Sequence, residues 1–415
     1  MRRIELAVMG VAAAAASVFM AFWPAKVADY AGDAGPSLHA LINGDAGAAL
    51  GHPPAMGWFA IIFRAPVAFF ARHGSSLLEY RLGNVPCVLV LAALALWIVA
   101  EMQKDNAPFL ACAVVLALAI LGPMNFHALQ DGHPEELLGA ALCVAAVLAA
   151  ASGRSPLAAG VLLGLALATK QWAILAVGPA LLAAPRGRLT LGATALAVAG
   201  ALTAIPALVG PHDVLSQGTT AARATIVAQP DTIWWPLGHI HHISAAGMVV
   251  EKSTIPRWLA PLTHPLIAAL GVVLPLALFA RTRRYIVPRD TALALLALLF
   301  LLRCALDPMT IGYYHVPLLV SLLALEALHH RRAPLLTLIS SAVMWVLVAH
   351  LRWGLEPGKI ATVYLAWAIP LGAYLATRIY APSVINGLGK WLSTSLPSSV
   401  TTTRSSIRTP NAPGT

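Results

Sequence analysis

Long apolar runs, separated by short polar stretches, recur along the whole chain. Most of them approach the roughly 20 residues that a helix needs to cross a hydrocarbon core about 30 Å thick. The pattern therefore predicts an all-α, polytopic membrane protein with about twelve transmembrane helices. The predicted helices lie near residues 5–24, 82–101, 107–123, 136–151, 156–169, 172–185, 189–209, 262–280, 290–306, 309–328, 334–351 and 361–380.

Composition supports the membrane assignment. Of the 415 residues, 59% are hydrophobic and only 11% are charged, whereas soluble domains carry about 25% charged residues. The net charge of +10 fits Lys and Arg in cytoplasmic loops better than nucleic-acid binding. We expect one membrane domain over residues 1–381 and a disordered, cytoplasmic tail rich in Ser, Thr and Pro at 382–415.

The apolar segment at residues 57–74 decides the topology. It is interrupted by Arg64 and Pro66, which favours an amphipathic helix on the membrane surface over a spanning helix. With this interfacial placement, the basic N-terminus and the short basic loops all fall on one side, as the positive-inside rule requires. The sequence thus predicts two cytoplasmic termini and long outer loops at residues 24–81 and 210–261.

The first outer loop is acidic, with Asp29, Asp33 and Asp45 close behind the first predicted helix. A carboxylate at the membrane surface can act as a general base that takes a proton from an attacking hydroxyl. Asp33 is the preferred candidate and Asp29 the second. The structural alternative is that Asp33, which stands just before Pro36, caps a short helix.

The stretch "HALQDGHPEELLGAAL" places Asp131, His133, Glu135 and Glu136 together at the outer end of a predicted helix. Acidic residues that follow a proline suit the first turn of a helix, where they complement its dipole. The functional alternative is that these side chains bind substrate at the outer mouth of the helix bundle. Both interpretations remain open from the sequence alone.

Further polar residues follow at the outer ends of later helices. Lys170 and Gln171 separate two short apolar helices, where a lysine needs an anionic partner such as a phosphate unless it snorkels to water. Arg303 and Asp307 have the spacing of an i,i+4 ion pair on one helix.

A "YYH" segment, Tyr313 to His315, follows Asp307 after five intervening residues. Tyr314 and His315 in this segment can offer an aromatic face and hydrogen-bond donors to a sugar or a phosphate. We therefore count both residues among the candidates for substrate binding.

The loop "PDTIWWPLGHIHH" combines a tryptophan pair, typical of the membrane interface, with His239, His241 and His242. Three histidines at this spacing are weak support for a metal site. The chain also lacks a Walker A loop, a dinucleotide fingerprint and an H-E-x-x-H motif. The sequence therefore predicts neither a metal nor a cofactor.

The order of these motifs resembles a known enzyme class. An acidic loop follows helix one, then come "DGHPEELLGAAL", "AGVLLGLALATKQWAILAVGPALLA" and a late Asp-Pro and Tyr-Tyr-His segment. Together they resemble the polyprenyl-phosphate-dependent membrane glycosyltransferases of the C-type fold, especially family 87, which includes the actinobacterial mannosyltransferases. The resemblance implies the C-type architecture, with the interfacial helix and the active site on the outer face of a bacterial plasma membrane.

The resemblance also implies a reaction. A hexose or pentose, with mannose favoured, would pass from a polyprenyl-phosphate donor to a lipid or cell-envelope glycan acceptor, with inversion and without a metal. Asp33 would be the base, while Lys170, with Arg303 and His315, would stabilise the departing phosphate. The alternative is a multi-pass transporter or flippase, which would be expected to carry its ionisable groups near the middle of the membrane.

Overall fold

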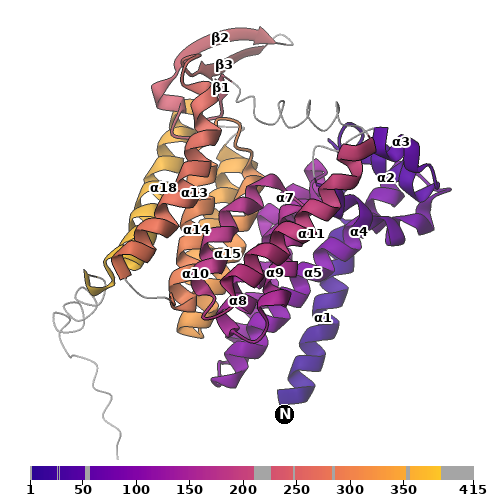
Figure 1. Cartoon of the computed structure of the whole chain (residues 1–415). Helices are drawn as coiled ribbons and strands as arrows, with labels where there is room; N and C mark the ends of the chain where they lie inside the picture. The colour runs from indigo at the N-terminus through magenta and orange to yellow at the C-terminus, as the bar shows by residue number, and fades with distance from the viewer. Residues whose placement is uncertain are drawn as a thin grey trace, which may run out of the picture.

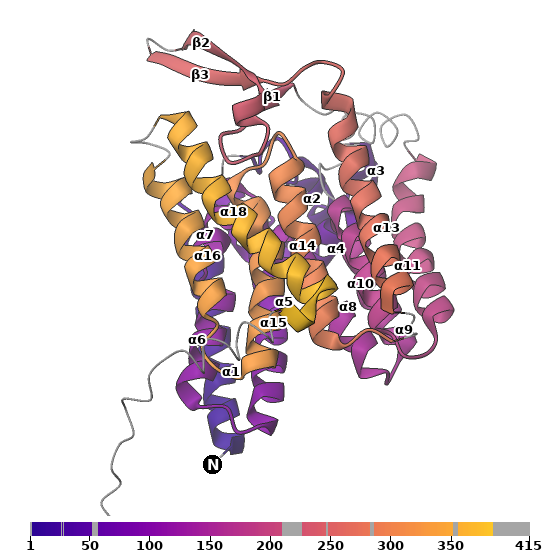
Figure 2. The same ribbon diagram turned by 90° about the vertical axis from the view of Figure 1, so that its left-hand side faces the viewer.

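Helices, most of them roughly aligned, build the molecule, and a small sheet covers one end of the bundle (Figures 1 and 2). In both views the N-terminus lies at the opposite end from the sheet. This computed structural model describes residues 2–25, 27, 29–51, 57–209, 226–245, 248–282, 286–351 and 356–384.

The first half of the chain forms a hydrophobic bundle that begins with the long helix α1. Short helices α2 to α4 follow α1 at the sheet end, and the long helix α5 then returns through the bundle. The bounds are α1 Arg2–Phe22, α2 Gly35–Ile42, α3 Ala46–Gly51, α4 Trp58–Ala68, α5 Ser76–Lys104, α6 Phe109–Leu121, α7 Pro123–Asp131 and α8 Pro134–Ser152.

The second half adds helices around α8 and carries the sheet. Four of its described elements are short 3-10 or π turns that continue neighbouring helices, and one of them, η4 Ala260–Leu262, leads into the helix that begins at Thr263. The bounds are α9 Pro156–Leu167, η2 Gln171–Ala176, α10 Val177–Ala183, α11 Arg188–Val209, α13 Thr263–Thr282, α14 Arg289–Leu306, η5 Gly312–His315, α15 Val316–His330, α16 Leu335–Trp345, η6 Val346–Leu351 and α18 Pro357–Tyr380.

Small residues allow α9 to pack closely on α11. A Cβ atom at Gly160 would lie 2.7 Å from the Leu191 carbonyl oxygen, and one at Gly164 would lie 2.7 Å from that of Ala195. A small-x-x-x-small pattern is a common means of bringing membrane helices together. The close contact fixes α9, and with it the turn that carries Lys170.

The helical architecture predicted from the apolar runs is confirmed, with a helix at each predicted position. The largest boundary differences are at α15, which begins at Val316 rather than near residue 309, and at α5, which begins at Ser76 rather than near residue 82. Ser75 accepts a hydrogen bond from the Leu78 N–H and so caps α5 at this earlier position. Among the described residues, six helices are long and apolar enough to cross a membrane. The number of about twelve spans and the C-type architecture remain predictions.

Segment 57–74 is helical, as α4 and the 3-10 turn Phe69–Ala71. Its predicted position on the membrane surface remains a prediction. The predicted loops and tail also include residues outside the described part of the chain, at 26, 28, 52–56, 210–225, 246–247, 283–285, 352–355 and 385–415.

The long loop after α11 holds a three-stranded antiparallel sheet that the sequence did not predict. Its strands, β1 Val227–Ala228, β2 His239–Ala245 and β3 Met248–Thr254, lie in the order β1-β3-β2. The loop is anchored to the bundle because the Trp234 indole N–H donates to the Leu306 carbonyl at 2.6 Å. The expectation of a purely helical chain is therefore incomplete at this point.

Candidate active site

Charged side chains from four separate segments meet inside the bundle. They come from the turn after α1, the start of α8, the residue before η2 and the end of α14. The charged cluster consists of Asp29, Asp33, His133, Glu135, Glu136, Lys170 and Arg303.

Two fully buried glutamates form the centre of the charged cluster. Pro134 starts α8, which places Glu135 and Glu136 in its first turn, where the helix dipole favours negative charge. The Lys170 Nζ lies 3.0 Å from Glu135 Oε1 and 3.5 Å from Glu136 Oε1. Lys170 therefore turns to buried carboxylates, and the alternative that it snorkels to water is wrong.

Arg303 provides the second cation. Its Nη1 lies 3.9 Å from Glu136 Oε2, and its guanidinium lies over the rings of Trp172 and Tyr314 at 5.0 and 4.5 Å. The Trp172 indole N–H also donates to Glu136 Oε1 at 3.2 Å. Two cations thus balance two buried carboxylates, which buried charges require.

His133 joins this ion-pair network to the first loop. Its Nδ1 lies 2.8 Å from Glu135 Oε1, its Nε2 lies 3.3 Å from Asp29 Oδ2, and its ring stacks on Tyr313 at 4.6 Å. Burial opposes the charged form of His133, but the hydrogen bond and the charge of Glu135 raise its pKa above the ordinary value. In its protonated form, His133 links the carboxylates of Asp29 and Glu135 on its two sides.

A backbone contact holds the first loop in place. The Asp29 N–H donates to the Asp131 carbonyl at 3.0 Å, next to Gly132, whose φ is +106°. A Cβ atom at Gly132 would lie 2.9 Å from the Tyr30 nitrogen. Glycine is needed at this position for both its conformation and its small size.

Asp33 is the partly exposed carboxylate at the edge of the charged cluster. Its side chain is 30% exposed, and Oδ2 lies 4.0 Å from His133 Nε2. Burial raises the pKa of Asp33, while the charges of His133 and Lys170 oppose the increase. The alternative of a helix cap is wrong, because α2 is capped by Ala34 without a side-chain hydrogen bond.

Asp45 has a structural role instead. Its Oδ1 accepts a hydrogen bond from the Ala48 N–H at 2.8 Å, at the start of α3. A carboxylate in this position satisfies a free N–H of the first helical turn. Of the three aspartates of the first loop, Asp29 and Asp33 therefore belong to the charged cluster, and Asp45 caps α3.

The predicted ion pair between Arg303 and Asp307 is wrong. The backbone leaves the helix at Asp307, with ψ of 116°, so its carboxylate no longer lies on the helix face above Arg303. Asp307 lies 3.7 Å from His264 and accepts the Met309 N–H at 3.0 Å. The i,i+4 spacing applies only while the helix continues.

The other predicted substrate-binding residues divide into two groups. Asp131 pairs with His127 at 3.3 Å, and Tyr314 lies beneath Arg303, so both border the charged cluster. His315 is fully buried and turns to the Tyr364 hydroxyl at 3.1 Å, while Gln171 is exposed at the start of η2. The structure thus places His315 against α18 rather than in the charged cluster.

Sequence reasoning missed Trp172 and Arg64 near the charged cluster, whereas Tyr313 belongs to the "YYH" segment that it singled out. Trp172 and Tyr313 contact Glu136 and His133, as described above, and Arg64 of α4 is fully buried between the rings of Tyr30 and Tyr80, 5.6 Å from each. The sequence could have indicated Arg64, because an arginine inside an apolar helix is expected to face the protein interior, where it needs partners.

The histidines of the long loop lie on β2, away from the charged cluster. His241 bonds to the Thr254 hydroxyl at 2.9 Å, and His242 lies 3.9 Å from Glu251. Within the described ranges, no group of three or more His, Cys, Asp or Glu side chains could hold a metal ion.

Long apolar helices around a partly open charged cluster indicate a membrane protein with a polar site among its helices. The sequence model of glycosyltransferase family 87 matches residues 52–306, more than half of the chain. The chain therefore belongs to glycosyltransferase family 87, which indicates glycosyl transfer rather than transport. No curated protein and no solved structure matches it.

The family match contains Glu135, Lys170 and Arg303, whereas Asp29 and Asp33 precede its first residue. The structure nevertheless places both aspartates beside His133, which lies inside the match. The candidate base, Asp33, and the candidate phosphate ligands, Lys170 and Arg303, thus belong to one cluster of contacting side chains.

Proposed function

We propose that this family 87 member transfers a hexose or pentose from a polyprenyl-phosphate donor to a lipid or cell-envelope glycan acceptor. The reaction would take place on the outer face of the bacterial plasma membrane, with mannose as the favoured sugar. One observation carries the proposal: a partly exposed carboxylate, Asp33, and two buried cations, Lys170 and Arg303, belong to a single connected cluster. Such a cluster offers a base and a phosphate site together.

Asp33 acts as the general base in this proposal. It takes the proton of the acceptor hydroxyl, whose oxygen attacks the anomeric carbon of the donor sugar. The new C–O bond forms as the bond to the phosphate oxygen breaks, and the electron pair leaves with the phosphate. A single displacement of this kind inverts the anomeric centre. The raised pKa of Asp33 increases its basicity and favours this role.

Lys170 and Arg303 stabilise the phosphate as it gains negative charge. Both cations are already held in place by Glu135 and Glu136, so little reorganisation is needed when the charge develops. Removing one such donor typically lowers the rate by about 10² to 10³. Because the chain supplies these cations itself, we propose a reaction that needs no resident metal or cofactor.

The test is an assay of the purified full chain in lipid nanodiscs. Radiolabelled polyprenyl-phospho-mannose, other polyprenyl-phospho-sugars and nucleotide sugars are each supplied with candidate lipid acceptors, with and without EDTA. We expect transfer from a polyprenyl-phospho-sugar alone, with EDTA having no effect. Transfer that requires a nucleotide sugar would contradict the proposed polyprenyl-phosphate donor. Loss of transfer in EDTA would contradict the proposed metal-free mechanism.

Two substitutions in the same loop test the base. Asp33→Asn removes the base and should lower kcat about 10²- to 10⁴-fold. Asp45→Asn is the matched control, because asparagine caps a helix about as well as aspartate and should leave transfer unchanged. Equal activity in the two variants would exclude Asp33 as the base.

A further inference from the structure

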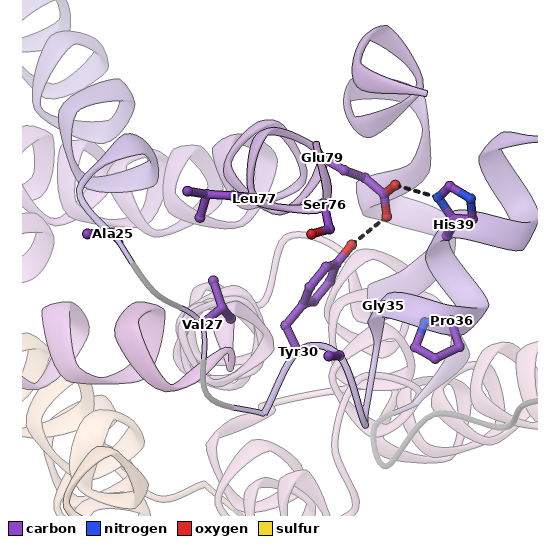
Figure 3. Close-up of a pocket in the computed structure, with 10 residues that line it drawn as sticks. Ala25, Val27, Tyr30, Gly35, Pro36, His39, Ser76, Leu77 and Glu79 are labelled. Atoms are coloured by element: carbon purple, nitrogen blue, oxygen red, sulfur yellow. Dashed lines mark hydrogen bonds and ion pairs between the residues drawn. The ribbon is translucent and has the colours of Figure 1, made fainter. Parts of the chain in front are cut away.

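A second polar site lies next to the charged cluster. A cavity of about 370 Å³ opens between the turn after α1, α2 and the first turn of α5 (Figure 3). Its volume lies within the range of small-molecule sites. The same turn supplies Asp33 to the charged cluster and Tyr30 to the cavity, so the two sites are neighbours.

One wall of the cavity is polar and built around Glu79. This carboxylate is only 4% exposed; it accepts the Tyr30 hydroxyl at 2.6 Å and contacts His39 Nδ1 at 2.8 Å (Figure 3). Burial raises the pKa of Tyr30, so the phenol remains a donor. Each oxygen of Glu79 retains acceptor capacity for a further hydrogen bond, and Ser76 adds a hydroxyl to the same cavity.

The remaining lining is largely apolar, with Val27, Pro36 and Leu77 among its residues. A sugar or cyclitol ring has matching properties, because its hydroxyls form a polar rim and its C–H groups form apolar faces. A carboxylate accepts hydrogen bonds from such hydroxyls strongly, but it repels an anion. The cavity therefore suits a neutral polyhydroxylated ring, whereas the phosphate of a lipid donor suits Lys170 and Arg303.

We propose that this cavity binds a neutral sugar or cyclitol ring of the acceptor, with Glu79 as its main hydrogen-bonding residue. This inference rests on the proposed function, because it assigns the ring to the acceptor of that reaction. A ring bound here would place the acceptor beside the turn that carries Asp33. Neither Glu79 nor His39 would take part in the chemical step, so both would act on binding.

Direct binding tests the cavity without catalysis. Saturation-transfer difference NMR on the full chain in nanodiscs would use methyl α-mannoside, methyl α-glucoside and myo-inositol as probes. Ser76→Trp fills the cavity from an exposed position, and Ser152→Trp makes the same change at an exposed site on α8. We expect Ser76→Trp to reduce the signal of at least one probe about tenfold and Ser152→Trp to leave it unchanged. Equal signals in wild type and both variants would overturn the inference.

Kinetics test the same cavity during transfer. Glu79→Gln weakens hydrogen bonds to a charged acceptor and should raise the acceptor KM about 10- to 100-fold, with the donor KM unchanged. Glu101→Gln, at the far end of the same helix, is the matched control.

The two proposals fail in different ways. Normal transfer with an unchanged acceptor KM in Glu79→Gln would overturn the cavity assignment alone. The opposite result is a chain that transfers no sugar from any polyprenyl-phosphate donor but still binds a probe, with Ser76→Trp abolishing that binding. This result would overturn the proposed function and leave the ring-binding site supported.

Discussion

Two pairs of carboxylates in the charged cluster have opposite surroundings. Glu135 and Glu136 start a helix, are fully buried and are held by Lys170 and Arg303. Asp29 and Asp33 lie in a turn, with side chains 51% and 30% exposed. Both pairs are acidic and adjacent to His133, yet they differ in access to water and in compensation by cations.

This difference indicates different roles for the two pairs of carboxylates. A fully compensated, buried carboxylate orients its cations and cannot readily accept a proton from an incoming molecule. A partly exposed carboxylate with a raised pKa can reach a substrate hydroxyl. We therefore expect substitutions in the helix pair to alter stability and phosphate binding, and substitutions in the turn pair to alter proton transfer.

Lys170→Met should have the largest effect on stability, because it leaves the helix pair with one cation fewer. It should lower kcat about 10²- to 10³-fold and the free energy of unfolding by about 3–5 kcal/mol, because a buried charge loses its partner. Denaturant unfolding in detergent and the transfer assay measure the two changes.

The double variant Lys170→Met with Glu135→Gln separates these effects. Removing the orphaned charge should restore much of the stability but none of the rate. Recovery of the rate would show that Lys170 serves only to neutralise Glu135.

Asp29→Asn tests which member of the turn pair takes the proton. We expect kcat to fall about tenfold or less, because Asp29 orients His133 at 3.3 Å while Asp33 remains as the base. Steady-state kinetics beside Asp33→Asn measure the difference. A larger loss in Asp29→Asn than in Asp33→Asn would assign the base to Asp29.

The pH dependence of transfer tests the coupling through His133. A general base must be deprotonated to act. Because the pKa of Asp33 is raised, kcat/KM should begin to fall at a higher pH than it would with an ordinary aspartate as the base. The His133 charge lowers the pKa of Asp33, so His133→Asn should move the acid limb to higher pH. His329→Asn, in the exposed pair with Asp290, is the control. An unchanged or lower limb in His133→Asn would contradict this coupling.

The smallest effect concerns the third aspartate of the loop. Asp45→Ala removes the cap of α3 and should lower the free energy of unfolding by about 1 kcal/mol. Transfer at saturating substrate should be unchanged. A large loss of kcat would show that α3 helps to position Asp33.

The sequence predicted the helices because apolar runs carry a strong local signal. It also named Glu135, Glu136 and Lys170 as candidate substrate-binding residues, because charges beside apolar runs need partners. It did not predict that Lys170 pairs with the two glutamates, since it expected a phosphate as the partner of Lys170. The Tyr30–Glu79 contact was not predictable, since its residues are 49 positions apart and each has an ordinary local surrounding. The sheet was missed because β2 is short and alternates weakly.

Gly132 has a consequence for how such an enzyme can be altered. The turn that presents Asp33 and borders the cavity rests against this one residue, where a Cβ atom would lie 2.9 Å from the Tyr30 nitrogen. A second contact joins the same part of the chain to the turn that carries Lys170, because the Gly57 N–H donates to the Thr169 carbonyl at 2.9 Å. Under the proposed function, redesign of this turn for another acceptor therefore has to keep glycine at position 132 and the backbone contact at Gly57.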